Sequence, residues 1–193
     1  VPPGADPHEF TLRPSQMRAL QDADLIVLSG HGMEPWWDAV AGQVDADAIV
    51  ITLGELEAVA PLALSMRGDV AATDPHMWLS PEILAVWAQE LSAELSAADP
   101  EGAAIYSANL AGLLAGIQAA RAEAEMLLEP VQAVSLVLGH DSIQYFEQSF
   151  GLTYGGALSD GHGTEAGAFS ISEIAGIDGP ACLVIDINEA GDH

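Results

Sequence analysis

The longest helical pattern in the sequence, over residues 99–128, is the feature that most constrains the fold. Apolar residues recur there at the helical period, and Pro130 ends the pattern. At about 1.5 Å per residue, such a helix is roughly 40 Å long, which is more than one small lobe needs. We therefore expect an N-terminal lobe over residues 1–98, a linking helix over 99–129 and a C-terminal lobe over 130–193.

Short apolar runs on both sides of this helix are typical of buried parallel strands. These runs cover residues 25–28, 48–53, 134–138 and 182–187. Helices are expected between them, over residues 14–22, 34–40, 80–97 and 142–150. Residues 54–73 are expected to be irregular. Strands that alternate with helices predict an α/β fold with parallel sheets.

The charge balance restricts the partners that the chain can have. Its 193 residues include four Arg, no Lys and 29 acidic residues, for a net charge of −25. A nucleic-acid role is disfavoured, because neutralising phosphates requires a basic face. A negative field attracts cations instead. No uninterrupted apolar run reaches the roughly 18 residues of a membrane span.

Cys182 is the only cysteine, so an internal disulfide and a cysteine-based zinc cluster are excluded. It lies in the last apolar run, which predicts a packed and unreactive thiol. The chain begins at Val1 without an initiator Met, and each lobe has fewer elements than a complete α/β lobe. We therefore expect that parts of both ends are lacking.

Three histidines, His8, His76 and His140, are 68 and 64 residues apart, so that only the folded chain can bring them together. His140 follows an apolar run, as does His31, and ligand groups of α/β proteins gather at the carboxyl ends of strands. Imidazole suits Zn²⁺ and other borderline metals. By spacing alone, the histidines are equally compatible with a metal site and with ordinary surface or core positions.

Three motifs raise the case for a metal site. The first is Pro7-His8-Glu9-Phe10, followed by Leu12-Arg13-Pro14-Ser15. The second is Asp74-Pro75-His76-Met77-Trp78-Leu79, followed by Pro81. The third is Gly139-His140-Asp141, followed by Tyr145-Phe146 and Phe150-Gly151-Leu152. In this order and at these distances they resemble the zinc-binding solute-binding proteins of bacterial ABC importers, the ZnuA-type (cluster A-I) family.

The resemblance implies two Rossmann-like α/β lobes with parallel sheets, joined by one long rigid helix, with the metal in the cleft between the lobes. It implies that His8, His76 and His140 bind one Zn²⁺ per chain. It further implies a periplasmic or otherwise extracytoplasmic protein that is not an enzyme. Its partners would be the membrane permease of an ABC importer and a periplasmic metallochaperone.

Departures from the family pattern leave the fourth ligand open. Some relatives have a Glu ligand just before the first His, where this chain has Pro7, and others use an Asp in a region beyond residue 193. His31 and His162 are candidates for an additional ligand or for a contact behind the ligands. Manganese-binding relatives are expected to carry a carboxylate at the position of His140, because that harder ion prefers oxygen.

Two other functions are compatible with the same histidines. A zinc hydrolase would use a metal-bound water with Glu9 or Asp141 as the base, but no hydrolase motif accompanies these residues. An acidic adhesin or structural domain would carry the histidines incidentally and would bind no metal stoichiometrically.

Overall fold

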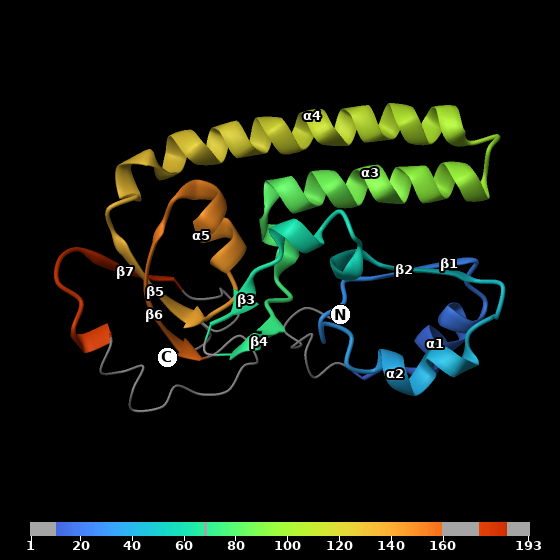
Figure 1. Cartoon of the computed structure of the whole chain (residues 1–193), viewed down its shortest axis with the longest axis horizontal. Coiled ribbons are helices and arrows are strands. Elements are labelled where there is room, and N and C mark those ends of the chain that lie inside the picture. Colours follow the sequence, from blue (N-terminus) through green and yellow to red (C-terminus); the bar gives the residue numbers. More distant parts are fainter. Residues whose placement is uncertain (1–10, 68, 160–173, 185–193) are drawn as a thin grey trace. The chain divides into compact units, whose positions relative to one another are not determined.

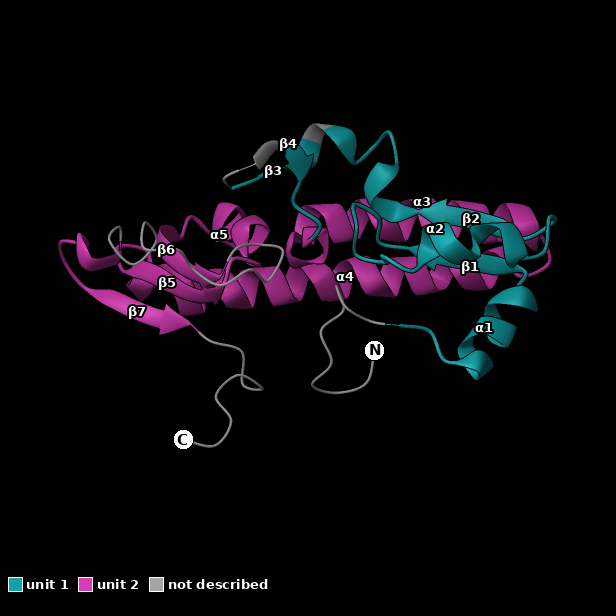
Figure 2. Ribbon diagram, turned by 90° about the horizontal axis from the view of Figure 1, so that it is seen from below, with its two compact units in different colours: residues 1–75 teal, residues 76–193 magenta. Residues whose placement is uncertain are grey.

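The computed structural model describes residues 11–67, 69–159 and 174–184. Its contacts divide the chain into two compact units, residues 1–75 and residues 76–193 (Figure 2). The second unit contains both long helices of the described chain together with the sheet that follows them (Figure 1). The expected lobe boundaries at residues 98 and 130 therefore differ from this division and stay a prediction.

The first unit contains a pair of parallel strands, β1 (Leu25–Leu28) and β2 (Ile49–Thr52), as expected from their apolar runs. Their register pairs Leu25 with Ile49 and Leu28 with Thr52. Side chains alternate across the strands, and Ile26, Leu28 and Ile51 are buried. Helix α1 (Pro14–Gln21) precedes β1, and the fixed φ of Pro14 suits its first turn.

Helix α2 (Trp37–Val40) is shorter than the helix expected over residues 34–40. The reason is that Glu34 belongs to the loop after β1, where its carboxylate accepts hydrogen bonds from the backbone N–H groups of Ser29 (2.9 Å) and Gly30 (3.0 Å). A 3₁₀ turn, η2 (Ala41–Gln43), continues α2. A helix was therefore predicted correctly in this region, but its predicted first residue, Glu34, was wrong, because the helix begins at Trp37.

Residues 54–73 are not irregular throughout, as the sequence had suggested. They contain the antiparallel strands β3 (Ser65–Met66) and β4 (Asp69–Thr73). The 3₁₀ turns η3 (Leu53–Glu55) and η4 (Ala60–Leu62) precede these strands. A strand of two residues has no alternation that a sequence pattern could reveal.

The second unit begins with a 3₁₀ turn, η5 (Met77–Leu79), and helix α3 (Pro81–Ala98). Ser80 caps α3 as expected, because its Oγ accepts a hydrogen bond from the backbone N–H of Ile83 (3.3 Å). Helix α4 (Ala103–Leu128) runs alongside α3 (Figures 1 and 2), and η6 (Glu129–Val131) with Pro130 ends it. The long helix predicted over residues 99–128 is confirmed, but it begins four residues later than expected, at Ala103.

A three-stranded parallel sheet follows α4 in the second unit. The central strand is β5 (Ser135–His140), with β6 (Thr153–Ser159) on one side and β7 (Ala181–Val184) on the other. Helix α5 (Gln144–Phe150) connects β5 to β6 and ends at Gly151, whose φ of 64° is left-handed. Leu136, Leu138 and Ala157 form the buried cluster of this sheet.

One expectation about exposure differs from the structure. Cys182 is exposed, because no described element covers β7.

One helix among the described residues, Ala103–Val131, is long and apolar enough by length and composition to cross a membrane. Alanine, glycine and leucine spread along this helix give that composition without an uninterrupted apolar run.

Ile83, in the first turn of α3, has no exposed surface. We expect Ile83→Ala to lower the free energy of unfolding by about 2–5 kcal/mol, because it leaves a cavity that the surroundings only partly fill. The matched control is Ile105→Ala on α4, where the side chain is 64% exposed. Its effect should stay within about 0.5 kcal/mol. Denaturant unfolding measures both variants, and equal losses would contradict the described core.

Candidate metal centre

His76 lies at the start of the second unit, directly before η5. His76 is only 3% exposed, and Met77 beside it is 1% exposed, so the short turn is anchored in the core. The ring of Trp78 contacts the His76 ring edge to face, with centroids 5.4 Å apart. Trp78 itself is 36% exposed and lies at the surface. The second motif therefore buries an imidazole in a rigid turn.

His140 is the last residue of β5, the central strand, and is half-buried. It pairs in register with Ser159, the last residue of β6. The Ser159 hydroxyl donates to the carbonyl oxygen of Gly139 (2.9 Å), and its oxygen lies 3.4 Å from Nδ1 of His140. A Ser159 hydroxyl that donates to Gly139 can accept from Nδ1–H of His140, which is the tautomer that this contact favours.

This contact has the form that metal-binding histidines usually show, in which one ring nitrogen donates to a neighbour and the other faces the metal. Ser159 also fixes the backbone beside His140, because its carbonyl oxygen accepts from the N–H of Asp141 (3.1 Å). Ser159 was not among the residues predicted from the sequence. The available signal was a polar residue at the end of the strand that neighbours the His140 strand.

The rings of His76 and His140 lie together, with centroids 5.4 Å apart and planes at 76°. Two imidazoles on one tetrahedral zinc, with Zn–N distances of about 2.0–2.1 Å, place their centroids about 5 Å apart. The observed separation is therefore compatible with a shared metal ion. Within the described residues no group of three or more His, Cys, Asp or Glu side chains is placed to hold a metal.

Each of the remaining predicted site residues lies either outside the described residues or in the first unit. His8 and His162 lie outside the described residues. His31 belongs to the first unit, where its Nε2 donates to the carbonyl oxygen of Gly54 (3.0 Å). A nitrogen that donates a hydrogen bond has no lone pair for a metal, so Nε2 of His31 is not a ligand in this arrangement.

The loop that holds His31 is tightly built. His31 has a φ of 51°, which is uncommon for a residue other than glycine, and it stands between Gly30 and Gly32, whose φ values are also positive. A Cβ on Gly54 would lie 2.6 Å from the carbonyl oxygen of Ser29 and 2.8 Å from the His31 ring. Only glycine therefore permits the close approach of the two loops. These contacts account for His31 as a structural residue of the loop.

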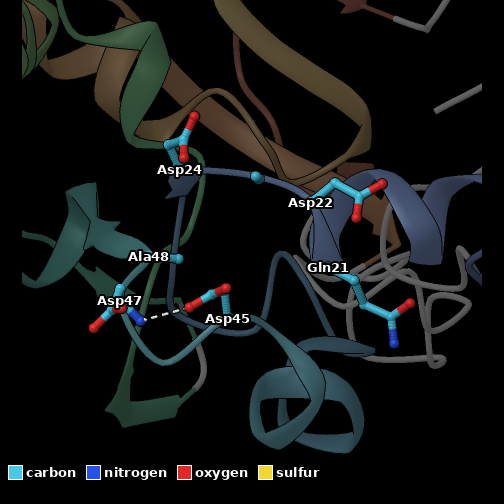
Figure 3. A pocket seen from close by; sticks show the side chains of 7 residues that line it. Gln21, Asp22, Asp24, Asp45, Asp47 and Ala48 are labelled. Carbon is cyan, nitrogen blue, oxygen red and sulfur yellow. Dashed lines mark hydrogen bonds between the residues drawn. The ribbon is translucent and has the colours of Figure 1, made fainter.

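An open pocket of about 400 Å³ in the first unit is lined by acidic side chains (Figure 3). Asp24 and Ala48 of this pocket directly precede β1 and β2, so the pocket lies at the amino ends of the parallel strands. Asp45 and Asp47 face it from the loop before β2, and Asp45 Oδ1 accepts from the backbone N–H of Asp47 (2.9 Å). Ligands of open α/β sheets bind at the opposite, carboxyl ends, and no histidine lines this pocket.

The described residues thus combine parallel strands and a long helix, an α/β arrangement, with a pair of imidazoles of which one, His140, ends a strand. The chain belongs to the ZnuA family, because the family model for the zinc-uptake complex component A, periplasmic, matches residues 1–177. This membership confirms the resemblance drawn from the three histidine motifs, and the α/β class with parallel sheets and a long helix is confirmed with it.

Individual relatives agree with this assignment. The high-affinity zinc uptake system protein ZnuA of Paracoccus denitrificans is 30% identical over 89% of this chain and 62% of its own length. The manganese-binding lipoprotein MntA of Halalkalibacterium halodurans is 28% identical over 78% of this chain and 49% of its own length. A zinc-bound crystal structure of a ZnuA deletion mutant aligns with a TM-score of 0.77, at 29% identity, over 90% of this chain and 65% of that one. The chain thus spans less than two thirds of the length of these relatives.

Proposed function

We propose that the chain captures Zn²⁺ outside the cytoplasm and delivers it to the membrane permease of an ABC importer for high-affinity zinc uptake. The observation that carries the proposal is the His76–His140 pair, 5.4 Å apart, in a chain of the ZnuA family. Lobe boundaries near residues 98 and 130, with the metal in the cleft between the lobes, belong to the same proposal.

His8, His76 and His140 are the proposed ligands of one Zn²⁺ per chain. The contact between Ser159 and Nδ1 of His140 supports the place of His140 in this set, because metal-binding histidines commonly use their second ring nitrogen in a contact of this kind. A fourth ligand would be water, His162 or a residue beyond position 193. Three imidazoles favour zinc over manganese, which prefers oxygen ligands, although one relative is named for manganese.

A periplasmic binding protein of this kind is not an enzyme, and its role ends with transfer of the ion. A periplasmic metallochaperone is a further proposed partner in that transfer. The net charge of −25 would raise the local concentration of cations near the protein. None of the relatives described above is named as an adhesin or as a hydrolase, so neither alternative gains support.

The experiment that tests the proposal is a zinc titration of chelator-stripped protein against a competing chelator of known affinity. We expect one equivalent of zinc per chain, in the nanomolar range, and weaker binding of Mn²⁺. Binding without a defined stoichiometry would contradict the proposal and would favour an adhesin or structural domain. Equal affinity for Mn²⁺ and Zn²⁺ would contradict the choice of cargo.

His31→Ala should leave the zinc affinity within about threefold of the unmodified chain, because Nε2 of His31 already donates to Gly54. The loss of this hydrogen bond should lower the free energy of unfolding by about 1 kcal/mol. The same chelator competition measures the affinity, and urea unfolding measures the stability. A drop in zinc affinity of tenfold or more would show that His31 acts in the site after all.

A further inference from the structure

Glu82, in the first turn of α3, contacts side chains from two other helices of the second unit. One carboxylate oxygen, Oε1, accepts a hydrogen bond from the Arg121 guanidinium on α4. The other, Oε2, accepts from the hydroxyl of Ser149 on α5 (3.2 Å) and from the hydroxyl of Ser80 (3.0 Å). Both oxygens of this carboxylate are thus used, and α3, α4 and α5 meet at one residue.

The chain places one of its few cations at this point. The chain has four Arg and 29 acidic residues. Arg121 pairs with two of these acidic residues, because its Nε also donates a hydrogen bond to Glu125 (2.8 Å), one turn along α4. The Arg121 guanidinium is planar and carries donors on both edges. It can therefore bind Glu82 while its contact with Glu125 fixes the orientation of the guanidinium. Glu82 is therefore held from two directions, by Arg121 and by Ser149.

The paired imidazoles each lie a few residues before one of the two helices, α3 and α5, that Glu82 and Ser149 join. His76 precedes α3 by the short turn η5, which is anchored by Met77. His140 ends β5, and α5 begins four residues later at Gln144. The hydrogen bond from Ser149 to Glu82 thus connects the segment of His76 to the segment of His140, which are otherwise 64 residues apart along the chain.

We propose that Glu82 is a positioning residue of the metal centre, which, through Arg121 and Ser149, fixes the separation of the His76 and His140 rings. This inference rests on the proposed zinc site. A metal held by two imidazoles requires their nitrogens within a few tenths of an ångström of their ideal positions. Groups that hold ligands without touching the metal change metal affinity by about 10–100-fold when they are removed.

A purely structural role makes a different prediction. The side chains of Glu82 and Arg121 are each 39% exposed, and ion pairs with this degree of exposure contribute little to stability. Burial raises the pKa of Glu82. Hydrogen bonds from its own backbone N–H and from Ser80, the positive charge of Arg121 and a hydrogen bond from Ser149 together outweigh this effect, so the pKa of Glu82 lies below its usual value. The small stabilisation is then present at neutral pH and is lost as the pH falls through this lowered pKa.

The test compares Glu82→Gln with Glu94→Gln, which removes the same charge from an exposed position of α3. Two properties are measured: the zinc affinity by chelator competition, and the ring signals of His76 and His140 by NMR on metal-free protein. We expect Glu82→Gln to lower the zinc affinity about tenfold or more and to shift both ring signals. Glu94→Gln should leave the affinity within about threefold and the signals in place.

Ser149→Ala is the second variant, because it removes only the link to α5 and keeps the charges of Glu82 and Arg121. It should shift the same ring signals and weaken zinc binding in the same direction. Unchanged ring signals and affinity in both variants, with circular dichroism showing a folded chain, would overturn the inference. The two proposals fail separately: without zinc binding by the unmodified chain the proposed function is wrong, whereas the metal-free ring signals still decide whether Glu82 positions the pair.

Discussion

His140→Ala is expected to lower the affinity for Zn²⁺ by at least about 100-fold, which corresponds to about 2.7 kcal/mol. The variant removes one of the two imidazoles whose ring centroids lie 5.4 Å apart, together with its contact to Ser159. His76→Ala should have an effect of the same size, because the buried His76 is the other member of the pair. Competition with a chelator of known zinc affinity measures both variants.

Two further variants make this result specific. His31→Ala is the matched control, since it removes an imidazole that already hydrogen-bonds Gly54. His140→Asp should weaken zinc binding less than His140→Ala and should raise the relative affinity for Mn²⁺, because a carboxylate oxygen suits the harder ion. Zinc affinity that is unchanged in His140→Ala would contradict the proposed ligand set directly.

Zinc is also expected to stabilise the folded chain strongly. A ligand that binds only the folded state, at a free concentration about 1,000 times its Kd, adds about 4 kcal/mol to the free energy of unfolding. The proposed ligands come from segments 64 or more residues apart, so the unfolded chain does not offer them together. Thermal unfolding with and without zinc should therefore show a large increase in the melting temperature, which a chelator reverses.

The same experiment on His140→Ala separates specific from unspecific stabilisation. In that variant the zinc-dependent increase should disappear almost entirely, while the metal-free melting temperature stays close to that of the unmodified chain. Mg²⁺ at the same concentration is the control for the general effect of cations on a chain with a net charge of −25. A zinc-dependent increase that persists in His140→Ala would place the ion elsewhere.

The larger elements of the fold could be predicted because their signals are local. The apolar runs of β1 and β2 and the Ser80 cap of α3 each depend on a few adjacent residues. The β3–β4 pair and the start of α2 were not predicted for the opposite reason. A two-residue strand is defined by its partner strand, and Glu34 leaves the expected helix to bind the backbone of residues five and four positions earlier.

The site was predictable only in part. His76 and His140 carry motifs that could be read in the sequence, and the structure brings these two residues together. Ser159 and Glu82 contact residues that are 19 and 67 positions away, and no spacing rule connects such pairs. The exposure of Cys182 was likewise misjudged, because an apolar strand becomes buried only where another element covers it.

Anomalous X-ray scattering at the zinc edge from crystals of the zinc-loaded protein tests the central claim most directly. The account predicts one strong peak per chain, about 2.0–2.1 Å from Nε2 of His140 and from one nitrogen each of His76 and His8. A peak at the acidic pocket before β1 and β2, or no peak within bonding distance of His76 and His140, would contradict it.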